Sequence, residues 1–217
     1  MAQPIEAVVF DMDGLMFNTE DLYDLVCDEI LLRRGKQFSL ELKLQMMGRK
    51  AEDAWNILRR ECDVSDPWQF LQTEADRIFE KLLPEKIEKL PGLDQVLDAI
   101  EQRGLPKAVA TSSRRAFAER AIGHFGLLKR FEFLLTGEDV SQAKPHPEIY
   151  WRAAAKLGTS CPQLLVFEDS FNGSKAAATA GAVTVAIPGS HSTSLDFSHA
   201  THRVASLADP LILSLLK

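Results

Sequence analysis

Short apolar runs alternate with helical patterns along the second half of the chain. Four runs rich in Val, Ile, Leu, Ala and Phe occur there, at residues 107–110, 133–136, 164–167 and 183–187. Between them apolar residues recur at helical spacing, at residues 116–125, 148–157 and 174–180. Alternating strands and helices are typical of a parallel sheet covered by helices on both faces. The sequence therefore predicts an α/β fold with a doubly wound parallel sheet.

A long helical segment separates a first strand from this α/β region. Residues 5–10 form an apolar, β-branched run that ends abruptly in a polar loop, as a buried parallel strand does. From residue 21 to about 89 the apolar positions follow helical spacing, with breaks at Gly48 and at Asp66-Pro67. We expect an all-helical insertion here, without strands. The predicted units are a core of residues 1–15 and 90–217 and an insertion of residues 16–89.

The composition is that of a globular protein with a modest negative charge. Of the 217 residues, 46% are hydrophobic and 26% are charged, which is enough apolar material for a core. Lys and Arg total 25 against 31 Asp and Glu, so the formal net charge is −6 and we expect no nucleic-acid partner. No run of about 18 apolar residues and no signal-peptide pattern occurs, so we expect a cytoplasmic protein without a membrane span.

Cysteines and the last apolar stretch bear on redox state and assembly. Cys27, Cys62 and Cys161 are widely spaced, with neither a CxxC pair nor a nearby His cluster, which indicates reduced thiols rather than zinc ligands. Residues 211–216 are apolar, and we expect them to pack on the edge of the sheet rather than form an interface. The expected state is a monomer.

Reactive side chains follow four of the predicted strands. They lie in the segments Asp11-Met12-Asp13-Gly14, Thr111-Ser112-Ser113, Lys144-Pro145-His146-Pro147 and Glu168-Asp169. In open α/β sheets, ligands bind beyond the carboxyl ends of the strands. We therefore expect these four segments to meet at one site.

Their residue types suit phosphoryl transfer. Residues two apart in extended chain point the same way, so Asp11 and Asp13 can face one ligand. A carboxylate is a nucleophile towards phosphorus, and crowded carboxylates need a cation such as Mg²⁺, for which Asp11 and Asp169 are the natural side-chain ligands. Lys144 would supply a point charge, and the Thr111 hydroxyl a hydrogen bond, for the phosphoryl oxygens.

Each segment alone has a simpler interpretation. A DxDG segment is often a turn with side-chain hydrogen bonds to its own backbone, and a Thr-Ser-Ser segment is often the N-cap of the next helix. A Lys before Pro is usually solvated, and Glu168-Asp169 could simply end a strand. The hypothesis of a site depends on the coincidence of all four segments at strand ends in one short chain.

In this order the segments resemble the four motifs of the haloacid dehalogenase-like hydrolases. The matching stretches are residues 10–15, 110–113, 143–147 and 167–170. Residues 15–20 and the helical insertion after them resemble the branch with a helical cap, which includes β-phosphoglucomutase and many small-metabolite phosphatases. The resemblance implies a Rossmann-like core, a helical cap and Mg²⁺ as cofactor.

The resemblance also implies a role for each motif residue. Asp11 matches the nucleophile, and Asp13 matches a general acid and base whose backbone carbonyl binds the metal. Asp169 matches an acidic metal ligand, and Glu168 assists through the same metal or a bound water. The phosphoryl-binding positions are matched by Thr111, Ser112 and Lys144.

The sequence departs from its relatives at several cap positions. Asn18 stands where many relatives have an acid, and we expect it to cap the first cap helix. Tyr23, Met47 and Ala51 stand where the mutase has a His, a Lys and an Arg, the last two for a second phosphate. Arg49 and Lys50 could grip a polar substrate, but a basic pair at a helix start is more often solvated.

The leading hypothesis is an Mg²⁺-dependent phosphatase that hydrolyses a small phosphorylated metabolite through an aspartyl-phosphate on Asp11. The alternatives are a β-phosphoglucomutase-like phosphosugar mutase, a receiver-like signalling domain with an Asp phosphoacceptor, and a non-catalytic protein that binds a phosphometabolite. The helical insertion and the DxD pair disfavour the receiver. The five intact residues Asp11, Asp13, Thr111, Lys144 and Asp169 disfavour the silent protein.

Overall fold

A parallel sheet forms the centre of the computed structural model, which describes residues 4–189 and 192–216. Within these residues the sheet has six strands in the order β3-β2-β1-β4-β5-β6. The strands are β1 (Ala7–Phe10), β2 (Lys107–Ala110), β3 (Leu134–Leu135), β4 (Leu164–Glu168), β5 (Val183–Ala186) and β6 (His202–Arg203). Every neighbouring pair is parallel. The predicted α/β fold class is confirmed.

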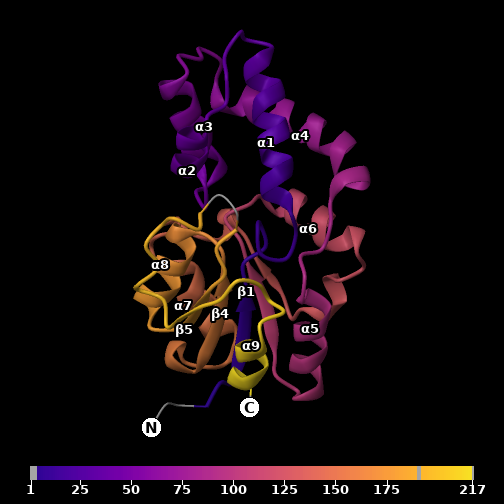
Figure 1. Ribbon diagram of the computed structural model, residues 1–217, viewed down its shortest axis with the longest axis vertical. Helices are drawn as coiled ribbons and strands as arrows, with labels where there is room; N and C mark the ends of the chain where they lie inside the picture. Colours follow the sequence, from indigo (N-terminus) through magenta and orange to yellow (C-terminus); the bar gives the residue numbers. More distant parts are fainter. Residues whose placement is uncertain (1–3, 190–191, 217) are drawn as a thin grey trace.

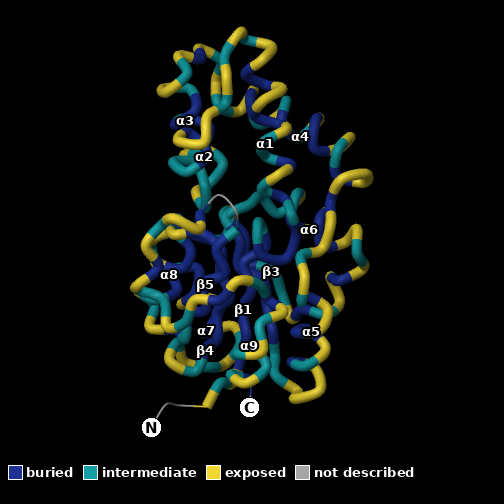
Figure 2. Tube along the Cα trace, viewed as in Figure 1, coloured by how far each residue is buried: buried dark blue, intermediate teal, exposed yellow. Residues whose placement is uncertain are grey.

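Helices cover both faces of the sheet, as the chain pattern predicts (Figure 1). They are α5 (Leu93–Gln102), α6 (Arg115–His124), α7 (Glu148–Leu157), α8 (Phe171–Ala180) and α9 (Pro210–Leu215). Short 3₁₀ helices lie at Leu128–Arg130, Gly137–Asp139 and Cys161–Gln163. Strand β1 is apolar throughout because both of its faces are buried. Val8 and Phe10 pack in the cluster that includes α5 and α6. Ala7 and Val9 pack in the cluster that includes α7 and α8. Both clusters are dark blue in Figure 2.

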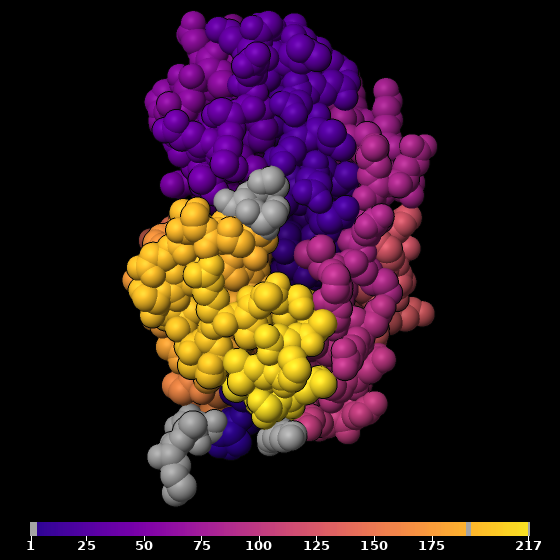
Figure 3. All heavy atoms as spheres, viewed as in Figure 1, coloured from indigo at the N-terminus to yellow at the C-terminus, as the bar shows by residue number. Residues whose placement is uncertain are grey.

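Four further helices lie together beyond the carboxyl end of β1, and we call them the cap. They are α1 (Thr19–Leu32), α2 (Leu40–Met46), α3 (Ala51–Glu61) and α4 (Trp68–Lys86). Figure 3 shows the cap, in indigo to purple, above the orange and yellow atoms of the core. One buried apolar cluster runs from the cap into the core, since it includes Leu22 and Leu71 as well as Val96 and Phe167. The predicted boundaries of the two units stay a prediction.

The chain enters and leaves the cap through two adjacent segments. The Leu90 amide donates to the Met16 carbonyl at 2.9 Å, and the Asn18 amide donates to the Glu88 carbonyl at 3.1 Å. The Asn18 side chain joins the same pair: its Oδ1 accepts from the Glu88 amide at 2.8 Å, and its Nδ2 donates to the Lys86 carbonyl at 3.2 Å. The prediction that Asn18 caps α1 by its side chain is wrong, because its side chain makes no capping hydrogen bond there.

Differences from the predicted elements are confined to edges and ends. Strand β3 has two residues instead of the predicted stretch 133–136, and β1 begins at Ala7 instead of residue 5. The sequence analysis missed β6, a two-residue strand that contains no apolar run. The C-terminal stretch packs on the core, where α9 lies against α5 and Ile212 and Leu216 are buried in the main cluster. Its packing on the edge of the sheet stays a prediction. In the part of the chain that the structure describes, no helix combines the length and apolar character needed to span a bilayer.

Gly92 makes a close approach that only glycine allows. It begins α5 with φ +92°, and a Cβ at this position would lie 2.2 Å from the Ala208 amide nitrogen. We predict that Gly92→Ala lowers the free energy of unfolding by about 3 kcal/mol or more, because positive φ and overpacking both act. Urea unfolding followed by circular dichroism measures the loss.

Gly104→Ala is the matched control for that measurement. Gly104 also has positive φ, at +64°, but nothing lies within 4 Å of an added Cβ. The free energy of unfolding of Gly104→Ala should fall by only about 1 kcal/mol, the cost of the backbone conformation. Equal losses in the two variants would contradict the close approach at Gly92.

Candidate active site

The four predicted segments meet at the carboxyl end of the sheet, beneath the cap. Asp11 and Asp13 follow β1, Thr111 follows β2, and Glu168 ends β4. A cavity of about 120 Å³ lies between this edge and the cap. Of the predicted site residues, it is lined by Asp11, Asp13, Ser112 and Asp169.

Lys144 is buried at the centre of the site. Its ammonium lies 2.6 Å from Asp11 Oδ1 and 2.6 Å from Glu168 Oε1, and it donates to the Ala110 carbonyl at 2.9 Å. Burial works to lower the pKa of Lys144, but the two carboxylates outweigh it and hold the pKa well above its usual value. Lys144 therefore stays charged and fixes the nucleophile candidate in place.

Glu168 is held on both of its oxygens. Oε1 also accepts from the Tyr150 hydroxyl at 2.6 Å, and Oε2 accepts from Ser170 Oγ at 3.2 Å. Gly173 makes room for this carboxylate, since a Cβ there would fall 1.8 Å from Oε1. The sequence analysis missed Tyr150: its place in α7 indicates a buried face, but no local pattern indicates a partner on β4.

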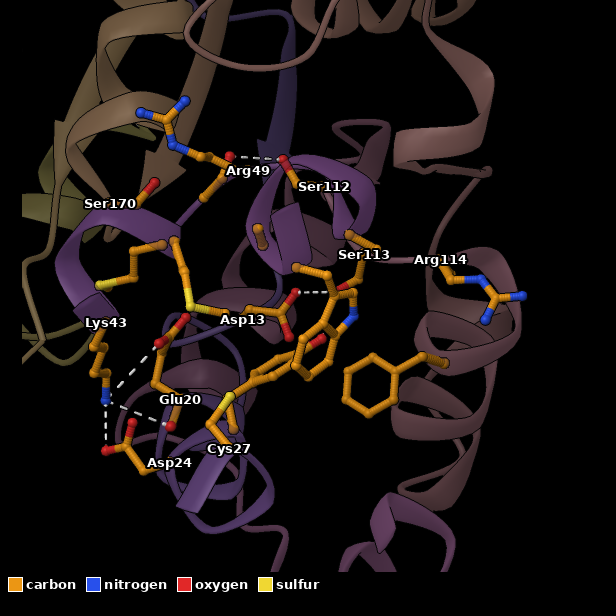
Figure 4. Close-up of a pocket in the computed structure, with 18 of the residues that line it drawn as sticks. Asp13, Glu20, Asp24, Cys27, Lys43, Arg49, Ser112, Ser113, Arg114 and Ser170 are labelled. Carbon is orange, nitrogen blue, oxygen red and sulfur yellow. Dashed lines mark hydrogen bonds and ion pairs between the residues drawn. The ribbon is translucent and has the colours of Figure 1, made fainter. Parts of the chain in front are cut away.

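One carboxylate oxygen of Asp13 accepts two hydrogen bonds, and the other has no partner among the described residues. Its Oδ2 accepts from Thr111 Oγ1 at 3.0 Å and from Ser113 Oγ at 2.7 Å, and Ser113 Oγ lies 3.2 Å from the Tyr23 hydroxyl (Figure 4). Its Oδ1 is buried without a hydrogen-bond partner among the described residues. Burial raises the pKa of Asp13, which favours a carboxyl group that carries a proton.

Thr111 lies deeper than the sequence analysis expects. It is fully buried, and its hydroxyl donates to Asp13 rather than lining the cavity. Ser112 does line the cavity, and its hydroxyl donates to the Gly48 carbonyl of the cap at 3.0 Å. Phosphoryl binding by these two residues stays a prediction. Ser113, absent from the predicted site residues, joins Thr111 in holding Asp13.

The acidic residues of the site fit a divalent cation. Asp11, Glu168 and Asp169 are buried and offer carboxylate oxygens that lie within 4.8 Å of one another. Asp169 Oδ2 is buried and has no partner among the residues that the structure describes. Burial, followed by mutual repulsion, raises the pKa of both Asp11 and Asp169. Oxygen donors with excess negative charge are what Mg²⁺ prefers.

A second acidic group faces the cavity from the cap. Glu20 is on α1, and burial, reinforced by the nearby Asp13, raises its pKa to about 7. Lys43 on α2 lies 4.0 Å from Glu20 Oε2 and makes a shorter ion pair, 2.7 Å, with Asp24. The sequence analysis did not select Glu20, because it stands in a helical pattern with many exposed acids.

The turn between α2 and α3 fastens the cap to the core. Asn172 Nδ2 donates to the Met47 carbonyl at 3.0 Å, and Lys50 Nζ donates to the Val140 carbonyl at 2.6 Å. Lys50 therefore joins cap and core instead of lining the cavity. Arg49 lines the cavity mouth, is exposed, and donates from Nε to the Gln45 carbonyl at 2.7 Å.

Comparison with known proteins extends the resemblance over the whole chain. (DL)-glycerol-3-phosphatase 2 of Arabidopsis thaliana is 34% identical over 221 residues, covering 98% of this chain and 88% of that protein. The phosphorylated carbohydrates phosphatase of Thermotoga maritima is 31% identical, and the match covers 82% of each chain. The crystal structure of CbbY from Rhodobacter sphaeroides in complex with phosphate has a TM-score of 0.87 at 25% identity, covering 97% of this chain and 99% of that one.

The family itself follows from the extent of the match. The sequence model of the haloacid dehalogenase-like hydrolases covers residues 8–187, which include all four motifs. The resemblance noted in the motifs is thereby confirmed, and the chain belongs to the haloacid dehalogenase-like hydrolase family.

Proposed function

We propose that the protein is an Mg²⁺-dependent phosphatase that hydrolyses a small phosphorylated metabolite through an aspartyl-phosphate on Asp11. The arrangement around Asp11 carries this proposal. Asp11 lines the cavity, and Lys144 holds its carboxylate at 2.6 Å. Asp13 also lines the cavity, and its Oδ1 has no hydrogen-bond partner among the described residues. A nucleophile, a fixed cation and a proton carrier thus meet at one end of one cavity.

In the first step Asp11 attacks the phosphorus atom of the ester. A bond forms between a carboxylate oxygen of Asp11 and phosphorus, and the bond from phosphorus to the leaving oxygen breaks. Asp13 gives its proton from Oδ1 to that oxygen, so that an alcohol leaves. Burial raises the pKa of Asp13, and this direction suits a group that has to hold and release a proton.

In the second step water hydrolyses the aspartyl-phosphate. Asp13, now a carboxylate, takes a proton from the water molecule. The water oxygen bonds to phosphorus, and the bond from phosphorus to the Asp11 oxygen breaks. Inorganic phosphate leaves and the Asp11 carboxylate is restored. Hydrogen bonds from Thr111 and Ser113 to Oδ2 hold Asp13 in one orientation through both proton transfers.

The metal ion would be held by Asp11, Glu168 and Asp169, and by the Asp13 carbonyl if the family pattern applies. When bound, Mg²⁺ neutralises charge on the phosphoryl oxygens and on the crowded carboxylates. Lys144 adds a fixed positive charge 2.6 Å from Asp11 Oδ1. The protein is proposed to act as a monomer, because its apolar C-terminal helix packs on its own core.

Relatives support a phosphatase over a mutase. The two curated relatives described above are named as phosphatases, one of phosphorylated carbohydrates and one of glycerol 3-phosphate. Met47 and Ala51, which replace the basic residues of the mutase, both line the cavity. A mutase would form a doubly phosphorylated sugar, which mass spectrometry of a turnover mixture would detect.

We predict that Asp11→Asn lowers Mg²⁺-dependent phosphate release by about 10³-fold or more, because the amide is a poor nucleophile. A panel of sugar phosphates, polyol phosphates and nucleotides, assayed with Mg²⁺ or with EDTA, measures the loss. Asp98→Asn is the control, since Asp98 is 59% exposed and pairs with Arg130 on the far side of the core. Equal activity in both variants would contradict the proposed mechanism.

We also predict that stabilisation by Mg²⁺ grows as pH rises. Because the pKa values of Asp11 and Asp169 are raised in the folded protein, it binds more protons than the unfolded chain. Without metal, these two groups therefore lower the free energy of unfolding as pH rises towards their raised pKa values. Protons and Mg²⁺ compete for the same oxygens.

The melting temperature, measured with Mg²⁺ and with EDTA, tests this prediction. At about 100 times its Kd a ligand stabilises by about 2.7 kcal/mol, so the shift should be largest at high pH and should shrink at low pH. Asp169→Asn should lose most of the shift and Asp98→Asn should keep it. A shift that is independent of pH would contradict metal binding by these carboxylates.

A further inference from the structure

The cavity also restricts the substrate, on the premise of the proposed phosphatase activity. We propose that the leaving group is uncharged and presents an apolar face, so that esters with a second phosphate or a carboxylate are poor substrates. Three features carry this inference: the aromatic wall, the state of the basic side chains, and the balance of charge along the cavity.

Aromatic rings from both cap and core form one wall of the cavity. Tyr23 on α1, Phe79 on α4 and Phe117 on α6 all line it. The Tyr23 and Phe79 ring centroids are 4.7 Å apart, and those of Phe79 and Phe117 are 4.8 Å apart. The Tyr23 hydroxyl lies 3.2 Å from Ser113 Oγ, which itself donates to Asp13. A leaving group above Asp13 therefore meets aromatic side chains, against which an anion would lose hydration.

Two of the three basic side chains along the cavity are paired with acids, and the third points away from Asp13. Among the described lining residues they are Lys43, Arg49 and Arg114. Lys43 is buried against Asp24 at 2.7 Å, and Arg114 pairs with Asp76 at 2.8 Å. The Arg49 guanidinium points away from Asp13 in Figure 4. None of these three presents an unpaired cation to the space above Asp13.

Acidic groups outnumber these cations. The described lining holds six carboxyl groups, on Asp11, Asp13, Glu20, Asp24, Asp76 and Asp169. Glu20 lies near the proposed metal region, since a Cβ added at Gly14 would contact both Glu20 and Asp169. Asp24 and Asp76 lie on the cap side, on α1 and α4. Because Lys43 and Arg114 are paired with Asp24 and Asp76, the cap side offers no excess positive charge to an anionic leaving group.

Hydroxyl groups of a leaving group can accept a hydrogen bond from the Gln72 side chain. Gln72 on α4 lines the cavity, its Oε1 accepts from Trp55 Nε1 at 2.8 Å, and its Nε2 donates to Asp76 Oδ1 at 2.7 Å. These two bonds fix the orientation of the amide, and an amide nitrogen carries two hydrogens. A neutral polyol with one apolar face fits this combination of fixed amide and aromatic rings.

The test uses substrate pairs that differ only in the tested property. Glycerol 3-phosphate and 3-phosphoglycerate differ by a hydroxymethyl group in place of a carboxylate. Benzyl phosphate and ethyl phosphate differ in the apolar face, while their leaving alcohols have similar acidity. With Mg²⁺, kcat/KM should be at least about tenfold higher for glycerol 3-phosphate than for 3-phosphoglycerate, and higher for benzyl than for ethyl phosphate.

Asp76→Asn links the preference to the cavity. The change removes the shorter ion pair of Arg114 and leaves the longer one to Glu138 at 3.6 Å, so the ratio of kcat/KM values should move towards 3-phosphoglycerate by about twofold to fivefold, the range expected for a partly exposed ion pair. Glu80→Gln is the matched control: Glu80 is also on α4 and pairs with Arg120 at 3.0 Å, but it lies outside the lining. It should leave the ratio unchanged.

Two outcomes overturn the inference: equal or faster turnover of 3-phosphoglycerate by the unmodified protein, or the same shift in Glu80→Gln as in Asp76→Asn. Absence of turnover above the Asp11→Asn background would instead contradict the proposed function. In that case calorimetric titration of Asp11→Asn with each glycerol compound and Mg²⁺ decides the inference. Tighter binding of glycerol 3-phosphate supports it, and equal or tighter binding of 3-phosphoglycerate overturns it.

Discussion

One buried cation fixes the geometry of the whole site. The Lys144 ammonium lies 2.6 Å from both Asp11 and Glu168 and also donates to the Ala110 carbonyl. The Tyr150 hydroxyl donates to Glu168. Buried charges are tolerated only with tight geometry and satisfied neighbours. Partners from β1, β2, β4 and α7 must therefore converge on one point. A parallel sheet with β1 between β2 and β4 provides this convergence.

Local signals in the sequence were enough for the core and for the residues at strand ends. The apolar runs predict five of the strands, and Asp11, Lys144 and Asp169 follow from the rule that sites lie where parallel strands end. Tyr150 and Glu20 were missed because their importance arises from neighbours distant in sequence. Asn18 was predicted as a cap from its position before a helix, but a pairing across the cap linkers takes its side chain.

The candidate active site is complete only when cap and core are together. The core supplies the carboxylates and Lys144, whereas the cap supplies Tyr23 and one half of the cavity. Contacts such as Asn172 to the Met47 carbonyl hold the two against each other. In the proposed mechanism a closed cap would keep bulk water away from the phosphoryl group during ester cleavage, whereas the second step would need one water molecule. Further polar contacts, such as Lys50 to the Val140 carbonyl and Ser112 to the Gly48 carbonyl, join the cap and the core around the cavity.

The paired linkers of the cap have a consequence for how such enzymes diversify. Because the segments around Asn18 and Glu88 are hydrogen-bonded neighbours, the insertion begins and ends at nearly the same place. One helical insertion can be exchanged for another without changing the order of the strands or the position of Lys144. The cap half of the cavity is thus encoded in one continuous stretch of the gene, apart from the strand ends that carry Lys144 and Asp169, and selection can alter that half while it preserves those strand ends.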